Sequence, residues 1–138
     1  QQRQPGPVLG VFDAVQRATE ADLAELATIH DQLERAAAAQ QIALFFEANQ
    51  ELHRKLQAMS GNRWLLSVIQ DLRKVLKLSR LHSLSLEGRL QQSLAEHRSI
   101  LQHVQAHDAA AAERAMYAHI ISGREALARM EAQAAKNS

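Results

Sequence analysis

The residues best suited to chemistry are three histidines, His53, His97 and His119, and one amide, Asn49. Each histidine falls on the apolar stripe of a different predicted helix, where side chains three or four residues apart face the core. Asn49 precedes His53 by four residues and therefore shares its helical face. Neutral imidazole nitrogens bind zinc, nickel, copper and iron well, and an amide oxygen suits harder divalent ions. These residues predict a buried site for a metal or a small ligand.

The other four histidines show that inward placement is not general in this chain. His103 and His107 align with a polar stripe that includes Glu96, and His82 lies at a predicted helix end. His30 borders apolar positions without clearly belonging to them. The contrast separates three core-facing histidines from the remainder.

Periodicity alone leaves three hypotheses open. Three nitrogens and one oxygen do not fill an octahedral shell, so water or the carboxylate of a ligand would complete it. A three-histidine metal site can also hydrolyse substrates through a metal-bound water of lowered pKa, but hydrolysis then needs a general base. The pattern indicates no inward Glu or Asp near these histidines. In the third hypothesis, they are hydrogen-bonded core residues without a ligand.

The composition favours one all-helical domain. The chain has 138 residues, of which 46% are hydrophobic and 4% aromatic, so its core must consist mainly of Leu, Ala, Ile, Val and Met. Both prolines lie within the first seven residues, so no proline interrupts a helix in the rest of the chain. We expect an all-α, antiparallel bundle of about six helices, because short connections make long neighbouring helices antiparallel.

Charge and cysteine content exclude several classes of function. Sixteen basic and fifteen acidic side chains give a net charge of +1, which argues against a dedicated nucleic-acid surface. The chain has no cysteine, and therefore no disulfide, thiolate nucleophile or Cys-ligated zinc. No apolar run approaches the roughly 18 residues of a membrane span, and no signal peptide is visible. We expect a cytoplasmic protein without a membrane partner.

Local signals divide the chain into its helices. Thr19 is a predicted N-cap with Asp22 in a capping box, and Asp108 is a predicted N-cap for the last helix. Gly61 is a predicted C-cap, whereas Gly88 is expected within a helix, which it weakens by about 1 kcal/mol. The predicted helices cover residues 11–17, 20–38, 40–60, 63–82, 86–107 and 109–134.

Several motifs together resemble a known family. The run FEANQELHRKL at 46–56 is followed by Ser-Gly-Asn at 60–62, and EHRSIL follows at 96–101. Asp108 and the run MYAHI at 116–120 complete the pattern. In order and spacing these motifs are similar to the FCD domain, the effector-binding domain of FadR-type GntR transcription regulators, over about residues 19–130.

The resemblance implies a bundle of six or seven helices around a divalent metal ion. Asn49, His53, His97 and His119 would be the metal ligands. Zinc, nickel and manganese all suit this nitrogen-rich set. The family also implies a homodimer, a small organic acid that binds over the metal, and no enzymatic activity. In such regulators the effector modulates DNA binding by a winged helix-turn-helix domain.

Three departures from the family pattern bear on these expectations. We expect residues 1–18 to be a linker or a truncated first helix and residues 19–135 to be the FCD-like ligand-binding and dimerisation domain. No DNA-binding domain is expected in this chain, so DNA contact would require a separate N-terminal domain. The first ligand position holds Asn49 rather than Asp, and a neutral amide oxygen binds a metal less strongly than a carboxylate.

Three arginines are candidates for effector binding. Arg73 and Arg80 flank the apolar stripe of one predicted helix, and Arg89 precedes His97 by about two turns. A guanidinium group is suited to bidentate recognition of a carboxylate. The alternative is that these arginines extend along the surface into solvent.

Overall fold

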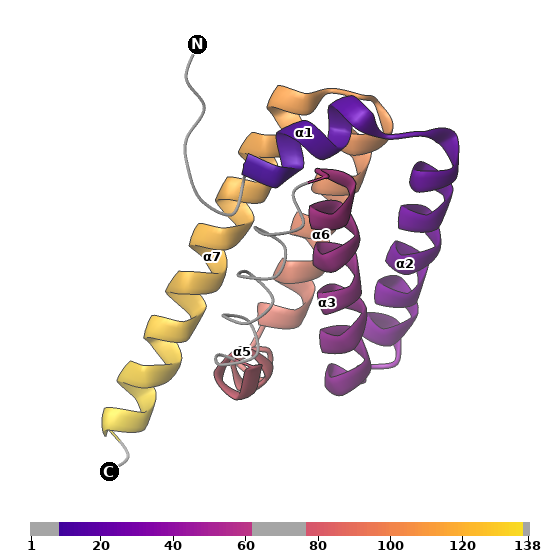
Figure 1. The fold of residues 1–138 in the computed structure, drawn as a ribbon. Coiled ribbons are helices and arrows are strands. Elements are labelled where there is room, and N and C mark those ends of the chain that lie inside the picture. The colour runs from indigo at the N-terminus through magenta and orange to yellow at the C-terminus, as the bar shows by residue number, and fades with distance from the viewer. Residues whose placement is uncertain (1–8, 62–76, 137–138) are drawn as a thin grey trace.

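The computed structural model describes residues 9–61 and 77–136. The described residues form six helices and no strand, so the expectation of an all-α bundle is confirmed. Figure 1 shows long helices lying side by side, with the C-terminal helix extending beyond the others. The helices are α1 (Leu9–Arg17), α2 (Glu20–Ala38), α3 (Ile42–Met59), α5 (Lys77–Ser83), α6 (Arg89–Gln105) and α7 (Ala109–Lys136).

Two helix starts follow the predicted caps. Thr19 Oγ1 accepts a hydrogen bond from the Asp22 backbone N–H at 3.1 Å, and the Asp22 carboxylate accepts one from the Thr19 N–H at 3.1 Å. This capping box satisfies two donors that a helix start would otherwise leave open. Asp108 Oδ1 likewise accepts from the Ala111 N–H at 3.1 Å at the start of α7.

Two glycines lie at helix ends, one where the sequence predicted a helix end and one where it did not. Gly61 follows α3 with a φ of +81°, as predicted for a C-cap. The prediction for Gly88 was wrong: it precedes α6 as the N-cap, with a φ of +79°. Ser83 and Ser85 donate to carbonyls one turn earlier and end α5, so the chain turns before α6 begins at Arg89.

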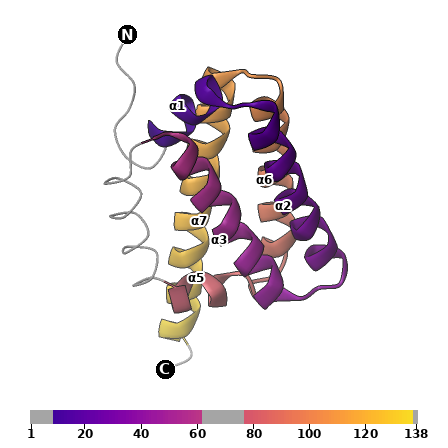
Figure 2. The ribbon, with the colours of Figure 1, turned by 45° about the vertical axis from the view of Figure 1, so that its right-hand side comes forward.

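The described part of the bundle consists of two packed helix pairs and two short helices, α1 and α5, which both lie against α3 and α7. α2 packs antiparallel to α3, and α6 packs antiparallel to α7 (Figure 1). α2 also contacts α6, while α1 lies against α3 and α7 (Figure 2). The core is mainly aliphatic, with Phe45 and Phe46 as its buried aromatic residues. This arrangement turns the inner faces of α3, α6 and α7 toward one interior region.

Some sequence predictions lie outside the described residues. Of the helix predicted over 63–82, only 77–82 falls in the described part, within α5. Asn62 and Arg73 are also outside it. Over the described residues, we find no helix with the length and hydrophobicity needed to cross a lipid bilayer.

Replacement of a fully buried leucine tests the core. Leu33 is 0% exposed, so Leu33→Ala should lower the free energy of unfolding by about 2–5 kcal/mol through lost burial and a residual cavity. Leu44 is 51% exposed, and Leu44→Ala should cost less than about 0.5 kcal/mol. Chemical denaturation of both variants measures the difference. Equal losses of stability would contradict this packing.

Candidate metal and anion site

Three helices bring the predicted histidines together. His53 comes from α3, His97 from α6 and His119 from α7, and all three side chains are buried. One ring nitrogen from each lies within 4.8 Å of the other two. The ring centroids of His97 and His119 are 4.3 Å apart, and His53 is 5.5 Å from each of them. The rings therefore converge closely enough to share one ligand.

His97 lies deepest and has a defined tautomer. Its side chain is 0% exposed, and its Nδ1 lies 2.7 Å from the Ser93 carbonyl oxygen one helical turn earlier. Because a carbonyl only accepts, Nδ1 carries the proton and Nε2 keeps its lone pair. Within the described part of the chain, the buried Nε2 atom has no hydrogen-bond partner. It is therefore available to a ligand.

His119 is oriented by a carboxylate. Its Nδ1 lies 2.6 Å from Glu96 Oε1, which also accepts from Arg89 Nη1 at 3.3 Å. A hydrogen bond from Nδ1 to a carboxylate fixes the ring and makes the opposite nitrogen a stronger donor to a metal. The geometry is that of a histidine prepared for ligation through Nε2.

Glu96 is the residue that sequence reasoning missed. Its side chain is 19% exposed and contacts His119, so the expectation of no acidic group near these histidines was wrong. The helical period predicts which face of its helix Glu96 lies on. It does not predict that the long Glu96 side chain reaches His119 on another helix. The available signal was its place directly before His97 in the Glu-His motif.

Asn49 and His53 line the same cavity from α3. Both side chains are buried, as their spacing of one turn predicted. The Asn49 Oδ1 atom is buried and accepts no hydrogen bond from any described residue. Burial of an amide oxygen without a hydrogen bond costs free energy of folding, so this atom is a candidate metal ligand beside the imidazoles.

The local environment favours neutral imidazoles beside an ionised carboxylate. Burial lowers the pKa of His97 well below 6.5, and the nearby His119 lowers it further. Burial also lowers the pKa of His119, against the opposing effect of Glu96. Burial alone would raise the pKa of Glu96, but the hydrogen bond from His119 and the charge of Arg89 contribute to lowering it overall. These protonation states are those that metal binding requires.

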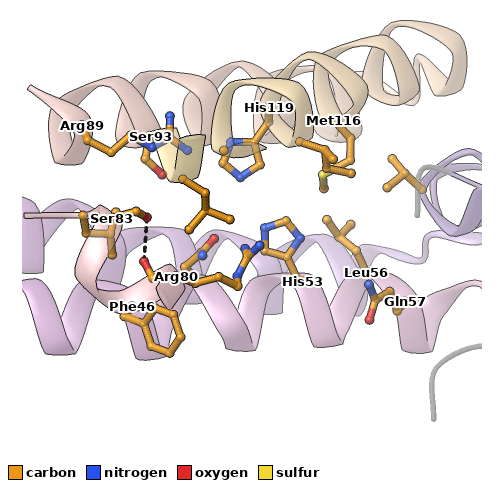
Figure 3. Close-up of a pocket in the computed structure, with 16 residues that line it drawn as sticks. Phe46, His53, Leu56, Gln57, Arg80, Ser83, Arg89, Ser93, Met116 and His119 are labelled. Atoms are coloured by element: carbon orange, nitrogen blue, oxygen red, sulfur yellow. Dashed lines mark hydrogen bonds between the residues drawn. The ribbon is translucent and has the colours of Figure 1, made fainter. Parts of the chain in front are cut away.

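His53 and His119 line a cavity of about 200 Å³. Figure 3 shows His53 and His119 facing each other across it, with Arg80 extending toward His53. Apolar side chains including Phe46, Leu56 and Met116 form much of its wall. The combination of apolar walls with a few convergent polar groups is typical of small-ligand sites.

Two of the three candidate arginines line this cavity. Arg89 is 4% exposed, so the alternative of a solvent-exposed side chain does not hold for it. Its Nη1 donates to Gln92 at 3.0 Å and Ser122 at 2.7 Å as well as to Glu96. Arg80 is partly buried, and no described residue accepts a hydrogen bond from its Nε atom. Burial and the charge of Arg89 lower the pKa of Arg80.

The remaining histidines are not part of the cluster. His30 is buried, but its Nε2 lies 2.9 Å from Glu34 on the same helix. His82 and His107 are exposed, and His103 is partly exposed. His82, His103 and His107 match the contrast drawn from the sequence, and His30, which the sequence left ambiguous, is buried but paired with Glu34.

Comparisons with known proteins agree with the fold. The sequence profile of the FCD domain matches residues 8–122. The structure of E. coli McbR/YncC is similar to this one, with a TM-score of 0.81 at 19% sequence identity. That match covers 90% of this chain and 63% of that chain, so this chain spans less than two thirds of the other's length. No curated protein matches the sequence.

The buried imidazoles predict a loss of stability in acid. Because the folded state lowers the pKa of His97 and His119, the unfolded chain binds more protons below about pH 6.5. The free energy of unfolding of metal-free protein should therefore fall as the pH drops from about 7.5 to about 5.5. Urea denaturation in the presence of a chelator measures this slope. His97→Gln should reduce the slope and His103→Gln should not; a slope unchanged by His97→Gln would contradict the assignment.

Proposed function

Because this chain belongs to the FCD domain family, we propose that it is the effector-sensing domain of a GntR-family transcription regulator. The proposed effector is a small carboxylate bound over a divalent metal ion. The metal would be held by Asn49, His53, His97 and His119. The observation that carries the proposal is the convergence of three buried imidazoles from three helices.

The donor set fits a divalent ion. The tautomer of His97 and the hydrogen bond of His119 to Glu96 both leave Nε2 as the donor atom. Asn49 adds a buried oxygen without a described partner. Zinc, nickel or manganese would suit these ligands. The bound ion would supply positive charge and open positions for a carboxylate.

The arginines support an anionic effector. Arg80 and Arg89 line the same cavity as His53 and His119. The guanidinium group of Arg80 would bind a carboxylate by charge-assisted hydrogen bonds inside a poorly solvated space, and Arg89 would add positive charge to the cavity wall. A third candidate, Arg73, remains a prediction because it lies outside the described residues.

Regulation would require parts beyond the described domain. We infer that the domain forms a homodimer and works in the cytoplasm, and that effector binding alters DNA binding by a separate winged helix-turn-helix domain. The family membership favours this sensing role over a metallohydrolase. Glu96, the acidic group beside the histidines, already accepts hydrogen bonds from His119 and Arg89, which suits ligand positioning better than activation of water.

Metal content tests the proposal directly. Protein purified without a histidine tag should retain close to one divalent ion per chain, measured by elemental analysis. His97→Ala should lose most of it, because the ion would lose a buried ligand. His103→Ala on the same helix is the matched control and should retain the ion. A His97→Ala variant that folds and holds as much metal as the control would reject the metal role.

Glu96→Gln tests the hydrogen bond behind His119. With a neutral amide as its hydrogen-bond partner, the His119 ring should bind the metal less strongly, and metal affinity should fall about 10–100-fold. Glu87 is exposed, and Glu87→Gln should leave the affinity unchanged. Competition with a metal-binding dye measures both. Equal affinities in the two variants would show that Glu96 does not support the site.

A further inference from the structure

The positive charge of Arg80 lacks a partner in the described structure. Arg80 is partly buried, its Nε has no hydrogen-bond partner among the described residues, and no described carboxylate contributes to its pKa. The charge of Arg89 lowers the pKa of Arg80, and the charge of Arg80 in turn contributes to lowering the pKa of His119. A positive charge that is partly removed from water and has no counter-ion is unfavourable, so this position favours a bound anion.

The other charges in the cavity do not supply that anion. Glu96 is the described carboxylate at the site, and its Oε1 already accepts from His119 and Arg89. Arg89 Nη1 is further occupied by Gln92 and Ser122. The two arginines therefore differ: Arg89 is fixed within the protein, whereas Arg80 is available to a ligand.

An effector with a single carboxylate would leave an excess of positive charge in the site. With a divalent ion bound as proposed above, the ion, Arg80 and Arg89 would face Glu96 alone among the described ionised groups. A ligand with a single negative charge would neutralise the open side of the ion and leave Arg80 uncompensated. The cavity volume of about 200 Å³ and its apolar walls, which include Leu84, Ile120 and Leu127, provide room for a short carbon spacer.

From this geometry we propose that the effector carries two anionic groups. One group is a carboxylate that binds the metal, and the second binds Arg80 across a short apolar spacer. This inference rests on the proposed function and adds a specificity-determining residue to it. The second group is a carboxylate or a phosphate, since a guanidinium binds both in the same bidentate manner.

Paired ligands of equal chain length test the inference. Calorimetric titration of the metal-loaded 138-residue chain should give at least about tenfold tighter binding of succinate than of butyrate, as expected for one added buried ion pair. 2-Phosphoglycolate distinguishes the second group: tighter binding than succinate identifies a phosphate, and weaker binding identifies a carboxylate. Butyrate bound as tightly as succinate and 2-phosphoglycolate would overturn the inference.

Variants of Arg80 separate recognition from folding. Arg80→Gln should reduce succinate affinity at least about tenfold and butyrate affinity less than about twofold, so the ratio of the two affinities approaches one. This ratio does not depend on the fraction of folded protein. Arg80→Lys should retain part of the preference, and Lys77→Gln, an exposed change on the same helix, should retain all of it.

Two outcomes distinguish this inference from the proposed function. If Arg80→Gln weakens succinate and butyrate equally, Arg80 does not read a second anionic group and the inference is wrong, while metal-dependent carboxylate binding remains. If the chain retains no metal, and a chelator leaves the binding of both acids unchanged, the proposed function fails. A preference for succinate that still disappears in Arg80→Gln would then support the second anionic group alone.

Discussion

The structure depends on the burial of three imidazoles within 4.8 Å of one another. Polar rings in an apolar interior destabilise a fold unless their nitrogens are satisfied. The Nδ1 atom of His97 is hydrogen-bonded to the Ser93 carbonyl, and that of His119 to the Glu96 carboxylate. The opposite nitrogens of these two rings then remain for the ligand that we propose.

The rest of the bundle positions these rings. α3, α6 and α7 each contribute one histidine, and α1 and α2 pack against this group from outside. Capping at Thr19 and Asp108 fixes where α2 and α7 begin, and the register of α7 determines where His119 lies. Arg89 begins α6 two turns before His97, so one helix carries both a cavity cation and a metal-ligand candidate.

The sequence predicted the inward residues but not their cross-helix partners. Period and spacing suffice for Asn49, His53 and His97, because the direction of a side chain is a property of its own helix. The contact between Glu96 and His119 joins residues 23 positions apart, and no local pattern contains it. The prediction for Gly88 was wrong for a related reason. Helix propensity gives the cost of a glycine inside a helix, but it does not show that α6 begins only at Arg89, directly after this glycine.

Anomalous diffraction at the absorption edge of the retained metal tests the central claim most directly. In crystals of tag-free protein, the account predicts one peak located about 2.0–2.2 Å from a ring nitrogen of His53, His97 and His119. Density for the Asn49 oxygen and for an acid should complete the coordination shell. Absence of a peak at this position, or rings that point away from a common centre, would contradict the account.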